Sequence, residues 1–128
     1  MIQVKKRMVE VLILVLISIL LGSFGQIFFK KGLSSLGGVN FTDFLGSKFF
    51  TIFFQPFVLV GMVLYISSVF VWFVVLSNSE VSYAYPLIGL SYILTAFIAW
   101  FYLKENVTAL RIMGIMLIVA GAFLVTKS

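Results

Sequence analysis

The sequence predicts an all-α integral membrane protein in which four transmembrane helices form a compact bundle within one domain, residues 1–128. Of its 128 residues, 62% are hydrophobic and only 10% are charged, whereas a soluble domain is about one quarter charged. The mean hydropathy of +1.22 agrees with lipid as the solvent. Four apolar runs also have the ~20 residues that a helix needs to cross a bilayer; they cover residues 9–29, 57–77, 83–103 and 107–126.

Each apolar run must be helical, because backbone groups find no water to bond inside a bilayer. The first run follows the basic stretch "KKR" and resembles a secretion signal. It is long for such a signal, and it leads into "FFKKG" rather than a small-residue cleavage site, so we interpret it as a mature transmembrane helix. Only "SNSEV" and "KENVT" connect the later runs, so the second, third and fourth helices should form antiparallel hairpins.

The first loop is longer and has two interpretations. Apolar side chains recur in it near helical spacing, whereas its polar side chains fall elsewhere, which is typical of a helix lying in the membrane interface over residues 42–53. The apolar set is Phe41, Phe44, Leu45, Phe49, Ile52 and Phe53. Alternatively, the second transmembrane helix begins early, near Phe49, with Pro56 in its first turns.

Composition argues against several function classes. The chain has no cysteine and no histidine, which removes thiolate chemistry and the commonest metal ligand. It holds no paired carboxylates, no nucleophile–base set and no nucleotide-binding loop, so we expect a protein that is not an enzyme and that uses no metal or cofactor. The net charge of +5 sits at the ends of the apolar runs, where it meets lipid headgroups rather than nucleic acid.

The orientation in the membrane is nearly unbiased. The face with both termini and the second loop carries Lys5, Lys6, Arg7 and Lys127, and the opposite face carries Lys30, Lys31, Lys48, Lys104 and Arg111. Four basic residues on one face against five on the other give little preference under the positive-inside rule. We expect the amino terminus on the cytoplasmic side, with dual topology as the open alternative.

Three of the helices carry polar stripes, which a lipid-facing helix should lack. The stripes are Ser18, Gly22, Gly25, Gln26 and Lys30; Gly61, Tyr65, Ser68 and Trp72; and Ser82, Tyr85, Gly89, Tyr92 and Ala96. Small residues allow close helix packing, which we assign to Gly22, Gly25 and Gly61. Long polar side chains are costly in hydrocarbon unless they face a cavity. We therefore predict one wet cleft with the binding residues Gln26, Lys30, Tyr65, Trp72, Tyr85 and Tyr92.

Pro86 lies among these residues in the third helix. Its missing N–H costs little if the helix begins just before it, and it frees carbonyl groups to line the cleft if the helix begins earlier. Tyr83, beside it at the membrane boundary, is interpreted as an interfacial anchor.

The fourth helix lacks a polar stripe after Arg111. Gly114 and Gly121 lie two turns apart on one face among bulky aliphatic residues. We assign this face to helix packing, between protomers in particular. Glu105, Asn106 and Thr108 precede the helix, where they would cap its first-turn amides.

Several segments resemble the drug/metabolite transporter superfamily, and within it the short four-helix members. Nearly the whole chain except the first loop takes part, and the nearest likeness is to subunits that flip aminoarabinose-phosphoundecaprenol across the bacterial inner membrane. The matching residues are "GQIFFKKG" (Gly25, Gln26, Lys30), Trp72, "AYPLIGLSYI" (Ala84, Tyr85, Pro86) and "KENVTALRIMGIMLIVAG". The related small multidrug resistance exporters carry a mid-membrane glutamate where this chain has Gly22. Because Glu10 lies near the membrane surface, proton-coupled cation export is disfavoured.

The resemblance implies a flippase for a polyisoprenyl-phosphate-linked sugar or a similar anionic amphiphile. Lys30 would hold the phosphate, Gln26 and Tyr85 would bond hydroxyl or phosphate oxygens, and Tyr65, Trp72 and Tyr92 would stack on the sugar. The alternatives are an exporter of a small drug, metabolite or guanidinium-like solute, and a non-transporting subunit that scaffolds a glycosyltransferase. We expect contact with membrane lipids and a homodimer, or a heterodimer with a similar four-helix subunit, in a bacterial or archaeal cytoplasmic membrane.

Overall fold

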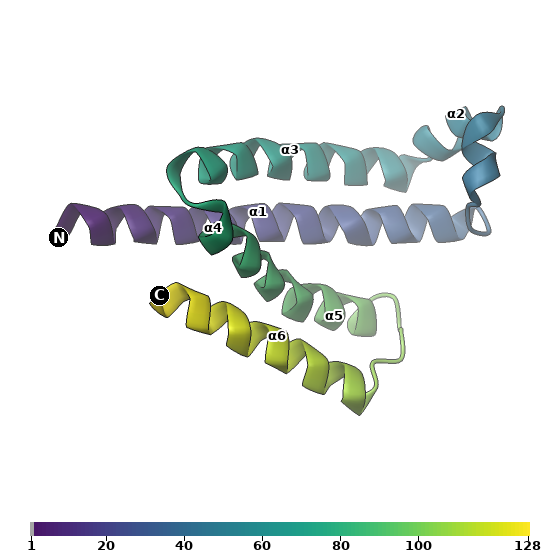
Figure 1. The fold of residues 1–128 in the computed structure, drawn as a ribbon. Helices are drawn as coiled ribbons and strands as arrows, with labels where there is room; N and C mark the ends of the chain where they lie inside the picture. Colours follow the sequence, from purple (N-terminus) through teal and green to yellow (C-terminus); the bar gives the residue numbers. More distant parts are fainter. Residues whose placement is uncertain (1) are drawn as a thin grey trace.

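A computed structural model describes residues 2–128, and it confirms the predicted fold class. Four helical segments are long and apolar enough to cross a membrane: residues 5–35, 56–78, 81–101 and 109–127. Figure 1 shows them as two antiparallel pairs that meet near one end of the molecule. Both termini lie at that end, together with the turn between the second and third segments. We call this end the terminal face and the opposite end the loop face.

Helix α1 spans Ile2–Ser35, well beyond the expected residues 9–29. Its 34 residues correspond to ~51 Å, more than the hydrocarbon thickness of a bilayer. The helix ends where Gly37 and Gly38 adopt positive φ angles of 79° and 90°, and their N–H groups bond the carbonyls of Ser34 and Leu33. This is a glycine C-cap. The apolar run therefore marks the membrane-embedded part of α1 and not its full length.

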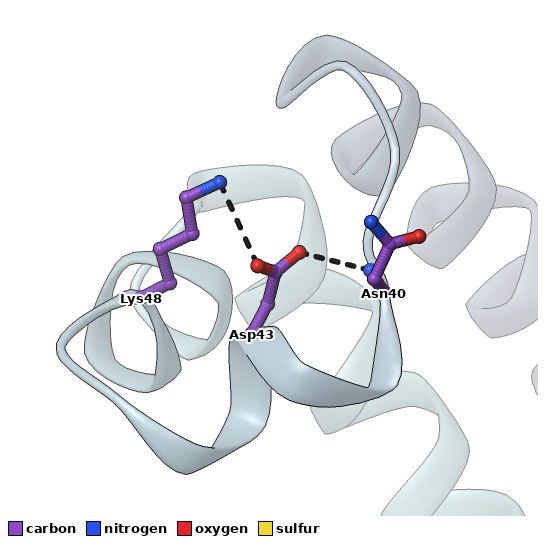
Figure 2. Close-up of polar contacts among 3 residues, drawn as sticks. All are labelled: Asn40, Asp43 and Lys48. Atoms are coloured by element: carbon purple, nitrogen blue, oxygen red, sulfur yellow. Dashed lines mark hydrogen bonds and ion pairs between the residues drawn. The ribbon is translucent and has the colours of Figure 1, made fainter.

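The first loop contains two short helices, η1 (Phe41–Leu45) and α2 (Lys48–Phe53), in place of one continuous helix over residues 42–53. Figure 2 shows how they are joined. The Asp43 carboxylate accepts a hydrogen bond of 2.9 Å from the Asn40 backbone N–H and lies 3.7 Å from Lys48 Nζ. The second transmembrane helix does not begin near Phe49, because Gln55 is extended before Pro56, as residues preceding proline tend to be.

Helix α3 spans Pro56–Asn78 and runs antiparallel to α1 over most of its length (Figure 1). The two backbones approach closely at Gly25 and Gly61. A Cβ atom on Gly61 would lie 2.7 Å from the Gly25 carbonyl oxygen, and one on Gly25 would lie 2.9 Å from the Gly61 carbonyl oxygen. The packing role predicted for these two glycines is confirmed.

The third span consists of three segments: α4 (Val81–Leu87), η2 (Ile88–Leu90) and α5 (Ser91–Phe101). Pro86 lies inside α4, so the helix begins before the proline and the proline leaves a carbonyl without its usual helical donor. The tighter 3₁₀ turn follows at once. Helix α6 (Ala109–Lys127) then returns antiparallel to α5, and the Thr108 side chain caps it by accepting from the Arg111 N–H at 3.2 Å.

The buried apolar core lies towards the terminal face, where α1, α3 and α4 meet. We call it the apolar plug; it comprises Val11, Val15, Ile19, Val75, Ala84 and Leu87. Tyr83 packs against this plug with its hydroxyl buried. Its interpretation as an interfacial anchor was wrong, because such an anchor keeps its hydroxyl among the lipid headgroups.

Candidate functional site

One cleft of about 410 Å³ lies between α1, α3 and the third span. Its lining combines hydroxyl, amide and aromatic side chains with few aliphatic ones. The lining residues are Ser18, Ile19, Gly22, Ser23, Gln26, Tyr65, Ser68, Val69, Trp72, Tyr85, Ile88, Ser91, Tyr92 and Thr95. The lining includes no charged residue, so the cleft is electrically neutral.

The structure brings five of the six predicted binding residues together on this cleft: Gln26, Tyr65, Trp72, Tyr85 and Tyr92. The sixth, Lys30, is exposed and does not line it. Lys30 lies one helical turn beyond Gln26, about 6 Å further towards the loop face. Its stripe leaves the cleft because residues at spacings of four drift round a helix of 3.6 residues per turn, and Ser18 and Lys30 end up about a third of a turn apart.

Small hydroxyl side chains bond across the floor of the cleft. Ser18 Oγ donates to the Ser68 carbonyl at 3.1 Å, and Thr95 Oγ1 donates to Ser23 Oγ at 3.2 Å, so both bonds join α1 to another helix. Ser68 Oγ donates to the Tyr65 carbonyl at 2.6 Å. Within the described residues these bonds leave the longer side chains of the cleft, above all Gln26 and the tyrosines, available to a ligand.

Two aromatic contacts hold side chains in place in the walls of the cleft. The Trp72 and Tyr85 rings meet edge to face with centroids 6.2 Å apart, which joins α3 to α4. Tyr65 packs on Phe29 with centroids 6.0 Å apart at the end of the cleft nearest Lys30. Tyr85 is 62% exposed and Tyr92 51% exposed, so both rings present a face to the cleft or to lipid. Exposed aromatic faces and free hydroxyls suit a sugar.

The 3₁₀ turn changes which residues of the third span face the cleft. Gly89, expected there, is buried against α6, where a Cβ atom would lie 2.8 Å from Ile118 Cγ2. Ile88 and Ser91 line the cleft instead. A 3₁₀ helix has three residues per turn, so the residues three and six positions after Tyr85 lie on the same side as Tyr85. The hydroxyl pair Ser91 and Thr95, four residues apart on α5, was the sequence signal that could have identified this face.

The cleft is closed on one side. On α1 the plug residues Val11 and Val15 lie nearer the terminal face than the lining, which runs from Ser18 to Gln26, and Ile19 belongs to both. The plug therefore separates the polar cleft from the terminal face. No cluster of three potential metal ligands occurs within residues 2–128.

The fourth transmembrane helix presents an open apolar face. Most large side chains of α6 are exposed, including Leu110, Leu117 and Leu124 at 69–75%. Nothing in the described chain lies within 4 Å of a Cβ atom placed on Gly114 or Gly121. The two glycines thus make no packing contact of the kind seen between Gly25 and Gly61, and their role between protomers stays a prediction.

Curated proteins of similar sequence are flippase subunits. The chain is 31% identical over 123 residues to a probable 4-amino-4-deoxy-L-arabinose-phosphoundecaprenol flippase subunit ArnF from Photorhabdus laumondii, which covers 88% of this chain and 93% of that protein. It is 35% identical over 113 residues to the corresponding ArnF of an Enterobacter species, covering 86% and 89%. A probable ArnE subunit of Pseudomonas fluorescens is 36% identical over 58 residues, covering 45% and 51%. No protein-family model and no solved structure matches the chain.

Proposed function

The chain belongs to the family of ArnF-type flippase subunits, a family of transporters, and on this premise we propose that it moves the headgroup of a polyisoprenyl-phosphate-linked amino sugar across the bacterial cytoplasmic membrane. The headgroup passes through the cleft while the isoprenoid tail stays in lipid. The observation that carries the proposal is an uncharged cleft of about 410 Å³, lined by hydroxyl, amide and aromatic side chains, among four helices apolar enough to cross a membrane.

A neutral cleft matches the chemistry of a sugar. Gln26, Tyr65, Tyr85 and Tyr92 offer donors and acceptors to ring hydroxyls, and Trp72 with Tyr85 provides aromatic surface for the sugar faces. Bonds of this kind replace water that the headgroup loses on leaving the aqueous phase. They do so without fixed charges in the cleft, which would hold an ionic headgroup too tightly for release.

Lys30 contributes from the rim rather than from the wall. Its backbone lies about one turn beyond Gln26, and a lysine side chain is long enough to bring its ammonium group back to the mouth of the cleft. In this arrangement the ammonium meets the phosphate as a point charge while the sugar occupies the cleft. While the sugar occupies the cleft, the phosphate therefore lies at its loop-face end, next to Tyr65 and Phe29.

The transporting unit is a dimer. Four helices are half of the number common in transporters with paired repeats, and the open face of α6 with Gly114 and Gly121 is where a second four-helix subunit packs. This subunit is a second copy or a similar, ArnE-like chain.

The test is the exposure of a labelled headgroup in proteoliposomes. The lipid-linked amino sugar is reconstituted with the purified protein, and the sugar that reaches the far leaflet is measured by its accessibility to a membrane-impermeant reagent. We expect protein-dependent exposure that falls at least tenfold in Gln26→Ala and in Lys30→Ala. Lys31→Ala is the matched control, because the Lys31 ammonium lies 4.8 Å from the Phe57 ring centroid and away from the cleft.

Normal transport by correctly inserted Gln26→Ala and Lys30→Ala proteins would contradict the proposed path. Transport of a small cationic solute without movement of the lipid would favour the solute exporter. No transport of either kind, combined with stoichiometric co-purification of a glycosyltransferase, would favour the scaffold.

A further inference from the structure

An open hollow that bears charged and hydroxyl side chains lies at the terminal face, on the far side of the apolar plug. Its volume is about 440 Å³, and it is formed by the start of α1, the turn between α3 and α4, and the end of α6. We call it the terminal-face pocket. Its polar lining includes Arg7, Asn78, Ser79, Glu80 and Tyr83. It shares no lining residue with the cleft.

Two of these residues already have partners. The Asn78 amide donates to the Val74 carbonyl at 2.8 Å, and Ser79 Oγ donates to the Val75 carbonyl at 2.7 Å. Both bonds satisfy carbonyl groups in the last turn of α3. The Asn78 amide also donates to Ser77 Oγ at 3.1 Å, so the donors of Asn78 and Ser79 are occupied. The donors and charges that remain in the pocket belong to Arg7, Glu80 and Tyr83.

Arg7 and Glu80 carry opposite charges on the same cavity without pairing with each other. The ion pair found within residues 2–128 is Lys48 with Asp43, in the first loop at the opposite face. Two unpaired opposite charges around one hollow offer separate positions for an anion and a cation. An arginine recognises phosphate oxygens, and a carboxylate recognises an ammonium group.

Tyr83 adds an unused hydroxyl. Its oxygen is buried and has no hydrogen-bond partner among the described residues. A buried polar group without a partner destabilises the fold, because it has lost its hydrogen bonds to water without replacement. A ligand whose entry displaces the side chains that cover this hydroxyl removes that destabilisation, which gives the pocket a third polar contact beside its two charges.

From this juxtaposition we propose that the terminal-face pocket is a docking site for a zwitterionic headgroup, with its phosphate at Arg7 and its amine at Glu80. The inference rests on the proposed function and deepens it, because an amino sugar linked to a phosphate carries both charges. The neutral cleft binds the hydroxyl groups of the sugar, whereas the terminal-face pocket binds the phosphate and the amine of the headgroup. Selection for the amine thus occurs before or after passage through the cleft.

The two cavities follow one another along one face of α1, which supports two binding sites on one path of the headgroup. Arg7, Val11, Ser18 and Gly22 follow at spacings of four, seven and four, which place them on one face of the helix. Arg7 and Val11 line the terminal-face pocket, and Ser18 and Gly22 line the cleft. Val15 lies between them on α1, with Val11 at the edge of the pocket and Ile19 at the edge of the cleft. A headgroup passing from one site to the other must therefore displace the plug.

The experiment compares two probe lipids on purified, folded protein: the phosphate-linked amino sugar on a polyprenol, and the same lipid with its amine acetylated. Affinity is measured in detergent, and transport is measured in proteoliposomes. We expect Glu80→Gln to weaken binding of the amine lipid about tenfold and to leave binding of the acetylated lipid unchanged. Arg7→Gln should weaken binding of both lipids. Lys6→Gln and Glu10→Gln remove the same charges from α1 outside the pocket and should change neither affinity.

Tyr83→Phe gives a second readout. Removing an unpartnered buried hydroxyl should raise the unfolding temperature of the free protein and lower its affinity for the amine lipid. Equal effects of Glu80→Gln on the two lipids, with normal transport by the wild type, would overturn the pocket and leave the proposed function intact. Amine-dependent binding without any transport would support the pocket and contradict the proposed function. Binding of neither lipid by the wild type would overturn both.

Discussion

Helices α1 and α6 both carry glycines on long apolar surfaces, but these glycines differ in whether another helix of the chain packs against them. The Gly25 and Gly61 backbones touch across α1 and α3, so closely that no side chain fits between them. Gly114 and Gly121 of α6 face open space within the chain. Moreover, α6 packs mainly on the α4–η2 part of the third span, through Gly89, and leaves most of its large side chains exposed.

The difference shows what a stripe of small residues encodes. Glycine allows close approach of helices in lipid, where apolar burial alone does not drive association. The sequence pattern is the same whether the approaching backbone belongs to the same chain or to another chain. The α1–α3 contact is completed within the chain, whereas the glycine surface of α6 has no partner among the described residues, and the proposed dimer would supply one.

The largest effect should come from filling the closed contact. In Gly61→Val the new side chain meets the Gly25 carbonyl and the Phe29 ring at distances below 3 Å, so α1 and α3 must separate. We expect a loss of about 3 kcal/mol in the free energy of unfolding. Thermal unfolding in detergent, followed by circular dichroism, measures it.

Gly114→Val is the matched control for this change, since nothing lies within 4 Å of that position. Its effect on the unfolding of the isolated chain should stay within about 0.5 kcal/mol. Similar losses in the two variants would remove the distinction between the two glycine surfaces.

The fold was predictable because lipid imposes a simple relation between apolar length and helix number. What the relation does not specify is where each helix ends. Helix α1 runs on to Ser35 through two lysines, because glycines at 37 and 38 stop it rather than the loss of apolar residues. In the first loop, the extended residue before Pro56 separates α2 from α3, which an apolar periodicity does not reveal.

The candidate site was predictable where regular helical geometry holds. On α3 the spacing of Tyr65, Ser68 and Trp72 places all three on the cleft. On the third span the 3₁₀ turn after Pro86 exchanges Gly89 for Ile88, and no periodicity of 3.6 residues anticipates that exchange. The terminal-face pocket depends on a turn and on parts of α1 and α6 far apart in sequence, so it was visible only in the folded chain.

A smaller effect is expected at the open glycine surface of α6. Gly121→Ile places a bulky side chain on the open face of α6 without a clash in the chain, so folding should persist while association of subunits weakens. We expect the dissociation constant of the dimer to rise about tenfold, or ~1.4 kcal/mol. Energy transfer between labelled subunits in liposomes measures it.

Met116→Ile changes the shape but hardly the volume of an exposed side chain on another side of α6, and it is the control for this change. Unchanged association in Gly121→Ile, or an equal loss in both variants, would show that the glycine face is not where the subunits meet.

The smallest effect concerns the link between the two halves of the chain. The bond from Thr95 Oγ1 to Ser23 Oγ, 3.2 Å long, joins α5 to α1 beside the cleft. Hydrogen bonds between transmembrane helices contribute ~0.6 kcal/mol on average, and Thr95→Val should cost about that much in unfolding free energy. In a double-mutant cycle with Ser23→Ala the two losses should be non-additive. Additive losses would mean that the bond does not couple the two helices, and that only side-chain packing of α4, η2 and α5 on the α1–α3 pair holds the two halves together.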